Sequence, residues 1–423
     1  MNLPKVPSLF KGTDYIKITI LSGGAAALSQ SAHSIILPLR VLDFVGESDK
    51  NTALAAMTFT GLILAMLFQP IAAALSDSTA SRWGRRKPWV MAGGLMIMAL
   101  LPGIPLAGSF ASLFLVYCLI QLAANTAQGP YQGYLPDMVP LDRRGAASSI
   151  KSGLELLGGA AGVLAVGALM AGYSKVNHTG LWVSLIVLEL MIGFILVYLW
   201  LRIKENPVQV RLTKLRNPLL SYRFNFKEHP GFAWLLGSRL LFFMAATTLQ
   251  QFALYYLRDV LGITNPAGMT AVFIIAAGAS MALAIVPAGF FADRYGTVNL
   301  SIGAGFLGGI GVLTLLIWPS TTTVIIAAGI TGFAIGIFGV ANWAMATKMV
   351  VKGEEARYLA IANMATAGGA ALSRLIGPVI DHFNRVGHNL GYQFMLAACV
   401  TYFILGGLLI INSNKHRPKV VIE

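Results

Sequence analysis

The chain has 423 residues, of which 56% are hydrophobic and only 11% are charged. A soluble globular domain carries about 25% charged residues, and no water-soluble fold could hide this much apolar surface. The composition therefore excludes an ordinary soluble enzyme and predicts an all-α integral membrane protein. The two cysteines, Cys118 and Cys399, both fall inside apolar stretches, so they indicate neither a disulfide framework nor a metal site.

Apolar runs near 20 residues recur along the chain, and each is long enough to cross about 30 Å of hydrocarbon. The first six predicted membrane helices are at residues 16–39, 53–75, 89–107, 111–135, 152–173 and 181–201. After a polar stretch, six more are predicted at residues 231–257, 269–292, 298–318, 322–346, 359–380 and 391–411. The sequence therefore predicts about twelve transmembrane helices.

The polar stretch at residues 202–230 carries seven basic residues and no apolar run long enough to span a membrane. It predicts a cytoplasmic linker between an N-terminal six-helix bundle, residues 1–201, and a C-terminal six-helix bundle, residues 231–414. Residues 415–423 then form a cytoplasmic tail.

Most of the 31 Lys and Arg residues lie in alternate loops. Because cationic loops tend to remain on the cytoplasmic side, this asymmetry predicts a multi-pass protein of the cell membrane with both termini in the cytoplasm. The same asymmetry explains the net charge of +14 without a nucleic-acid partner.

The strongest local motif joins the second and third predicted helices, at residues 76–89. Asp77 precedes Arg82, Arg85 and Arg86, and an Asp beside clustered arginines can form charge-assisted bonds that hold one conformation and break in another. The alternative is a loop whose charges only orient the chain. The pair Asp293-Arg294 follows the eighth predicted helix in the same way, as expected for a transporter built from repeated halves. We therefore predict that these six residues gate the protein.

This loop resembles the signature of the major facilitator superfamily, in the form seen in sucrose transporters and glycoside-pentoside-hexuronide symporters. Four further stretches are similar to these relatives: Gln-Pro at 69–70, residues 124–137, Tyr-Tyr-Leu-Arg-Asp at 255–259 and Asn-Trp-Ala at 342–344. The resemblance covers nearly the whole chain. It implies two six-helix bundles around a central cavity that opens alternately to each side.

The sequence departs from these relatives at the residues that bind their coupling ions. Symporters of the hexuronide type place cation-binding carboxylates on the second helix, where this chain has Ala65 and Gln69. Plant sucrose transporters have an Asp on the fourth helix, where this chain has Gln121. The resemblance therefore does not carry over a coupling site.

The fourth predicted helix bears a stripe of amides. Gln121, Asn125, Gln128 and Gln132 are spaced 4, 3 and 4 residues apart, which places them on one face. Each amide offers donors and an acceptor, which suits a hydroxyl-rich ligand such as a sugar. The alternative is that the amides bond neighbouring membrane helices.

The resemblance implies that the first, fourth, seventh and tenth helices line the cavity. The polar residues of those helices are the candidate substrate-binding residues. They are Gln30, His33, Gln121, Asn125, Gln128, Gln250, Asn342 and Trp343.

Ionisable groups inside a bilayer are costly and suggest function. His33, Glu155 and Glu189 are the candidates for proton coupling. His33 could instead be a hydrogen-bonded structural residue, and Glu155 could form a local ion pair with the residue one helical turn before it. Arg239 and Arg374 could hold an anionic substrate or neutralise internal acids.

No phosphate-binding loop and no His-Glu-x-x-His motif occurs in the sequence, so we expect no enzyme activity, cofactor or metal. The first hypothesis is a secondary active transporter that moves a small polar solute, a sugar or glycoside, by alternating access, with a proton as the possible coupling ion. The alternatives are an exporter of a non-sugar or anionic metabolite, and a non-transporting assembly factor or receptor on the same fold. The expected partners are the small-molecule substrate, the coupling proton and the lipid bilayer.

Overall fold

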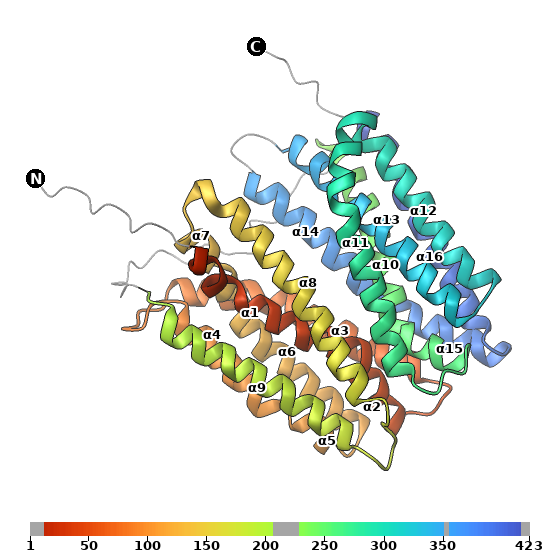
Figure 1. Ribbon diagram of the computed structural model, residues 1–423, viewed down its shortest axis with the longest axis horizontal. Coiled ribbons are helices and arrows are strands. Elements are labelled where there is room, and N and C mark those ends of the chain that lie inside the picture. The colour runs from red at the N-terminus through yellow and green to blue at the C-terminus, as the bar shows by residue number, and fades with distance from the viewer. Residues whose placement is uncertain (1–11, 206–227, 351–354, 416–423) are drawn as a thin grey trace, which may run out of the picture. The chain divides into compact units, whose positions relative to one another are not determined.

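The computed structural model describes residues 12–205, 228–350 and 355–415, and the regular secondary structure in these ranges is helical (Figure 1). The first half contains the following elements: α1 (Gly12–Ser31), η1 (Ala32–Ile36), α2 (Leu37–Phe44), α3 (Lys50–Asp77), α4 (Lys87–Leu100), α5 (Gly103–Leu106), α6 (Phe110–Gln132), α7 (Tyr134–Met138), η2 (Leu141–Arg143), α8 (Arg144–Leu169) and α9 (Thr179–Arg202). The second half contains α10 (Pro230–Asp259), α11 (Pro266–Tyr295), α12 (Thr297–Ile317), α13 (Thr321–Lys348), α14 (Glu355–Leu372), η4 (Ser373–Ile376), α15 (Gly377–Val386) and α16 (Leu390–Lys415).

Eleven helical segments among the described residues are long and apolar enough to cross a membrane. The first predicted helix is not one of them, and it consists of α1 and α2 joined by the π-helical turn η1. Such turns occur mostly as short insertions within α-helices. The prediction of an all-α, multi-span membrane protein is confirmed. The side on which the termini lie stays a prediction, and most of the predicted linker and tail falls outside the described residues.

The fifth predicted helix begins earlier than expected. Hydropathy placed its start at residue 152, whereas α8 begins at Arg144. Hydropathy marks only the apolar part of a helix, whereas the polar residues before it, around Lys151, are also helical and belong to α8.

The corresponding helices α6 and α13 of the two halves begin with the same capping structure. Ser109 and Ser112 form a capping box at the start of α6, and Ser320 and Thr323 form one at the start of α13. In this arrangement each of the two side chains bonds the backbone N–H of the other residue, which satisfies donors left free at the helix start. The shared cap is a further sign that the halves are related.

The chain divides into two compact units that do not coincide with the two halves of the sequence. Unit 1 comprises Met1–Ala32, Leu64–Leu169 and Tyr173–Pro218, and unit 2 comprises His33–Ile63, Met170–Gly172 and Leu219–Glu423. The segment His33–Ile63, which holds η1, α2 and the first half of α3, therefore packs with the second half of the chain. Helix α3 belongs to unit 2 at its start and to unit 1 at its end.

Within each unit, small residues let helices approach closely. In unit 1, a Cβ added at Gly162 of α8 would lie 2.7 Å from the Cα of Ala27 in α1. In unit 2, a Cβ added at Gly305 of α12 would lie 2.7 Å from the backbone oxygen of Phe403 in α16. Close backbone contact of this kind is typical of helix packing in membranes, where burial of apolar surface does not itself drive association.

Candidate functional site

Five residues of unit 1 form a charged network that we call the Arg86 cluster: Asp77, Arg85, Arg86, Asp137 and Glu205. Arg86 Nε donates to Asp137 Oδ2 over 2.5 Å, and Arg86 Nη2 lies 3.1 Å from Asp77 Oδ1. Arg85 Nη2 bonds the same Asp137 oxygen over 2.7 Å, and this hydrogen bond raises the pKa of Arg85. The predicted loop motif therefore does bring Asp77, Arg85 and Arg86 together. Arg82 is not in the cluster, and its guanidinium lies over the Trp83 ring.

The sequence prediction missed Glu205, the residue that fixes the loop backbone. Its two carboxylate oxygens accept hydrogen bonds from the backbone N–H groups of Arg86 and Lys87, over 2.9 and 2.8 Å. Gly84 precedes them with a φ of +97°, a conformation that L-residues with a side chain rarely adopt. The loop is thereby shaped to present Arg86 to Asp137.

The Arg86 cluster can be tested without removing a charge. A Cβ added at Gly133 would fall on the guanidinium of Arg86, while the backbone φ of −74° there suits alanine. Gly133→Ala should displace the guanidinium and lower stability by about 1–3 kcal/mol, the cost of losing a buried charge-assisted bond. Thermal unfolding in detergent measures the loss. Gly145→Ala is the matched control, because no atom lies within 4 Å of its added Cβ, and equal melting temperatures of the two variants would contradict the expectation.

The corresponding pair of the second half is arranged differently. Asp293 and Arg294, at the end of α11, are both exposed, and Arg294 lies over the ring of its neighbour Tyr295 at 5.5 Å. Among the described residues Asp293 forms no ion pair, although part of the loop that would match residue 137 falls outside them. The gating role of this pair stays a prediction.

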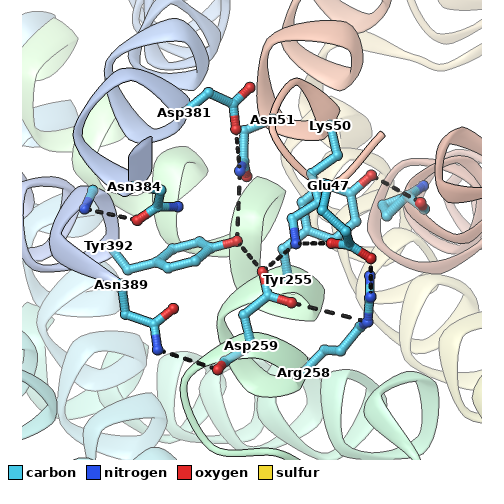
Figure 2. Close-up of polar contacts among 12 residues, drawn as sticks. Glu47, Lys50, Asn51, Tyr255, Arg258, Asp259, Asp381, Asn384, Asn389 and Tyr392 are labelled. Atoms are coloured by element: carbon cyan, nitrogen blue, oxygen red, sulfur yellow. Dashed lines mark hydrogen bonds and ion pairs between the residues drawn. The ribbon is translucent and has the colours of Figure 1, made fainter. Parts of the chain in front are cut away.

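Unit 2 contains a second charged network, the Asp259 cluster, which consists of Glu47, Lys50, Arg258, Asp259 and Tyr392 (Figure 2). Lys50 Nζ lies 2.5 Å from Asp259 Oδ2 and 2.6 Å from Glu47 Oε2, and the Lys50 residue is only 4% exposed. Arg258 bonds Glu47, and the Tyr392 hydroxyl donates to Asp259 over 2.5 Å. These bonds tie the loop between α2 and α3 to the end of α10 and the start of α16.

Asp381 of α15 caps helix α3 beside this cluster. Its carboxylate accepts from Asn51 Nδ2 over 2.8 Å, from the Thr52 backbone N–H over 2.6 Å and from Thr52 Oγ1 over 2.7 Å. An anionic acceptor at the first turn satisfies free backbone donors and complements the helix dipole. Asp381 is 2% exposed, so this cap is made in the interior of unit 2.

The pKa of Glu47 predicts how the Asp259 cluster responds to acid. Burial raises this pKa, but the hydrogen bonds and charges of Lys50 and Arg258 outweigh burial and lower it below its ordinary value of 4.5. A lowered pKa in the folded state contributes stability that is present above the unfolded-state pKa and lost as the pH falls through the lowered value. Acidification below about pH 4.5 should therefore lower the melting temperature less in Glu47→Gln than in the wild type.

The control for acidification is Asp142→Asn, which removes a carboxyl group with 77% side-chain exposure. This variant should keep the acid response of the wild type. A Glu47→Gln variant with an unchanged pH profile would contradict a role for the Glu47 carboxylate in the cluster.

The intramembrane arginine Arg239 lies at a junction of three helices in unit 2. Its Nε donates to Thr366 Oγ1 of α14 over 2.7 Å, and its Nη1 donates to Asn342 Oδ1 of α13 over 2.9 Å. Its guanidinium carbon lies 5.3 Å from the ring centres of Phe243 and Trp343. Two predicted substrate-binding residues, Asn342 and Trp343, are thus placed together with Arg239.

The amide stripe of α6 makes its observed hydrogen bonds within its own helix. Gln121 Nε2 donates to the Tyr117 hydroxyl over 2.7 Å, and Asn125 Nδ2 donates to the Gln121 backbone oxygen over 2.8 Å. Gln128 is half-buried, and among the described residues its amide makes no hydrogen bond. Gln132 is exposed.

The other candidates lie on several different elements. Gln30 lies in α1 and His33 in the π turn η1, while Gln250 Nε2 lies 3.5 Å from Ser34 Oγ. Glu155 pairs with Lys151 over 3.2 Å, which is the local ion pair named as its alternative explanation.

Glu189 is half-buried in α9, and it forms no ion pair with any described residue. Arg374 lies in η4 and donates to the Ala370 backbone oxygen and to Ser373 Oγ.

Solved structures of membrane transporters share this helical fold. A bacterial homologue of the human lysosomal transporter Spinster, in an inward-facing and occupied conformation, has a TM-score of 0.76 at 14% identity, covering 98% of this chain and 100% of that one. A D-xylose-proton symporter has a TM-score of 0.71 at 15% identity, covering 97% and 99%. A variant of the nucleoside transporter NupG has a TM-score of 0.72 at 15% identity, covering 94% and 99%. At these identities the likeness concerns the fold.

The sequence model described as MFS/sugar transport protein matches residues 23–384, so the chain belongs to this family of the major facilitator superfamily. The predicted family is confirmed. No curated protein sequence matches the chain significantly.

Proposed function

We propose that this protein is a secondary active carrier of the cell membrane that moves a sugar or a similar small polar solute by alternating access, with a proton as the coupling ion. The observation that carries the proposal is the arrangement at the two ends of α3. Its first residue, Lys50, belongs to the Asp259 cluster, and its last residue, Asp77, belongs to the Arg86 cluster. A helix of 28 residues separates these ends by about 42 Å, more than the hydrocarbon thickness of a bilayer.

Charged clusters at helix ends suit a reversible closure. When an ion pair opens, its two charged groups become hydrated again, so the paired and open arrangements differ in free energy by only a few kcal/mol. A substrate that binds one arrangement more tightly can supply that difference. An apolar contact of the same size would expose apolar surface to water on opening. In this proposal the Asp259 cluster opens in one stage of the transport cycle and the Arg86 cluster opens in another, so that each in turn holds its end of α3.

The amide stripe supports a polar solute. If Gln121 and Asn125 served to bond neighbouring helices, their amides would reach across to another helix, whereas their observed bonds stay within α6. A half-buried amide such as Gln128 can exchange hydrogen bonds with water or with a hydroxyl of the substrate. The similarity of the family to sugar transport proteins favours the same class.

Uptake by proteoliposomes tests the proposal. Radiolabelled pentoses, hexoses and disaccharides are offered with and without an imposed pH gradient, and accumulation driven by the gradient is expected for at least one of them. Gln128→Leu should reduce that uptake, while Gln132→Leu, at the exposed end of the stripe, is the matched control. Absence of uptake across the whole panel would overturn the sugar assignment.

Glu189 is the first carboxylate to test for the proton, because it makes no ion pair among the described residues whereas Glu155 does. Glu189→Gln should abolish accumulation driven by the pH gradient but retain exchange of the solute between the two sides. If Glu189→Gln accumulates the solute like the wild type, proton coupling does not pass through this residue.

A further inference from the structure

Arg239 is a buried cation without a buried anion. It is 7% exposed, and its two hydrogen-bond partners, the Thr366 hydroxyl and the Asn342 amide oxygen, are both neutral. No carboxylate pairs with Arg239 anywhere in the described ranges. By contrast, the buried Arg40 pairs with Asp43, and the buried Arg86 pairs with Asp77 and Asp137.

Burying a charge is costly unless an opposite charge or strong hydrogen bonds compensate it. Arg239 uses Nε and Nη1 for its two neutral partners, and among the described residues its Nη2 makes no hydrogen bond. The site therefore has one positive charge and at least one free donor in excess. Among the described residues no acid lies within ion-pair distance of Arg239, so neutralising an internal acid, the alternative role of this arginine, has no support there.

Asn342 adds a second unsatisfied donor beside the arginine. The amide is fully buried, and its Nδ2 atom has no hydrogen-bond partner. The orientation of the amide is fixed, because Oδ1 accepts from Arg239 Nη1 and a flipped amide would set two donors against each other. Since a buried donor without an acceptor is costly, the pair favours a conformation in which an acceptor reaches both groups.

The site is next to accessible surface. Trp343, whose ring faces the guanidinium, is 38% exposed. On α10, Phe243, Thr247 and Gln250 are half-buried and follow Arg239 at intervals of 4, 4 and 3 residues, which places them on the same face of the helix. A face that carries a charge, a hydroxyl and an amide does not suit contact with lipid, which favours contact with water or with a polar ligand.

We propose that Arg239 and Asn342 bind the carboxylate of a small monoanionic solute, with the Trp343 ring packing against its apolar surface. Arg239 donates from its guanidinium fork, and Asn342 donates from Nδ2. One guanidinium balances one negative charge, which favours a monocarboxylate over a dianionic phosphate. This inference rests on the proposed carrier function and narrows its substrate class from neutral sugars to sugar acids and related hydroxy acids.

The test is ligand-induced thermal stabilisation of the purified full-length protein at pH 7, since a ligand that binds the folded state raises its apparent stability. Gluconate and glucuronate are the acidic probes. Glucuronamide and glucose are their uncharged counterparts, and inorganic phosphate is the second anion. Stabilisation is expected from the acids, at lower concentration than from the amide or the phosphate.

Two substitutions then test whether Arg239 and Asn342 cause the stabilisation by the acids. Arg239→Gln should weaken binding of the acids at least about 30-fold, because losing one side of a buried charge pair costs about 2 kcal/mol or more and 1.4 kcal/mol is tenfold. Asn342→Asp places a carboxylate of the same size beside Arg239. It should raise the melting temperature of the ligand-free protein and abolish stabilisation by the acids, so a variant that gains stability but loses the ligand rules out misfolding as the cause.

Other outcomes overturn the inference. Equal stabilisation by glucose and glucuronate, unchanged in Arg239→Gln, would leave a sugar carrier whose arginine is structural. Stronger stabilisation by phosphate would replace the monocarboxylate with a phosphate ligand. If neither acid stabilises the wild type, the inference fails, while sugar uptake by proteoliposomes would still decide the proposed function separately.

Discussion

Replacing Asp381 with asparagine should destabilise the packing of α3 against the second half of the chain by about 3 kcal/mol, since charge-assisted hydrogen bonds contribute about 1.5–3 kcal/mol each. The carboxylate accepts three hydrogen bonds, from Asn51 and from the backbone and side chain of Thr52, and it is buried. An amide of the same shape loses the charge and turns an NH2 group toward one of these donors. The first turn of α3 would then lose its cap.

The effect is measured by hydrogen exchange of the Thr52 backbone amide, whose bond to Asp381 is 2.6 Å. A change of about 3 kcal/mol corresponds to roughly 100-fold faster exchange if opening is local. Asp49→Asn is the matched control, because it makes the same chemical change three residues away at a side chain with 54% exposure. Exchange at Thr52 that is unchanged in Asp381→Asn would show that the cap does not hold α3.

The helices could be predicted because membrane helices are recognised from local composition. Apolar runs bounded by polar turns located the eleven segments of the described residues that can cross a membrane. The family motif at residues 76–89 grouped Asp77 with Arg85 and Arg86, which lie fewer than ten residues away along the chain. The break in the first helix was not predicted, since a π turn changes one local hydrogen-bond pattern and leaves the composition apolar. Local sequence therefore identified the helices but not their irregularities.

The Asp259 cluster and the Asp381 cap were missed because they join residues far apart in sequence. Asn51 and Asp381 are separated by 330 positions, and no spacing rule relates them. One signal was present: the loops that flank Lys50 and Arg258 also carry Glu47 and Asp259, so each loop holds both signs of charge. Pairing opposite charges between loops on the same side of the membrane would have suggested the cluster.

For the candidate substrate-binding residues, too, the sequence did not reveal the hydrogen-bond partners. Helical spacing placed the four amides of α6 on one face, but it could not tell whether they bond a ligand or a neighbouring helix, because this depends on side-chain partners. For Arg239 the sequence left two roles open, holding an anionic substrate or neutralising internal acids. The structure favours the first role, because no described carboxylate pairs with Arg239 and the neighbouring Asn342 has an unsatisfied donor.

The second large effect is expected for Lys50, the central cation of the Asp259 cluster. Lys50→Met should cost about 3 kcal/mol, within the range measured when one partner of a buried ion pair is removed. The ammonium group bonds both Asp259 and Glu47 and lies 5.5 Å from the Tyr255 ring centre. Glu47 keeps its bond to Arg258, whereas the only ion pair left to Asp259 among the described residues is the longer contact with Arg258 Nε, over 3.9 Å. The cost therefore comes mainly from Asp259, whose side chain is only 15% exposed.

A double-mutant cycle separates the pair from its surroundings. Asp259→Asn keeps an acceptor for the Tyr392 hydroxyl, and the double variant with Lys50→Met leaves no uncompensated charge. The double variant should therefore be more stable than Lys50→Met alone, with a coupling energy of about 2 kcal/mol from melting or chemical denaturation in detergent. Additive effects would mean that Lys50 and Asp259 do not interact in solution.

The same cycle connects stability to transport. In the proposed mechanism the cluster must open once in each cycle, so weakening it lowers the population of the state that it holds and raises its opening rate. Lys50→Met should then slow net uptake while the double variant recovers part of it, because the double variant no longer buries an Asp259 carboxylate that has lost its short bond to Lys50. Uptake that falls further in the double variant would assign Lys50 or Asp259 a role beyond closure, such as direct contact with the solute or with the coupling proton.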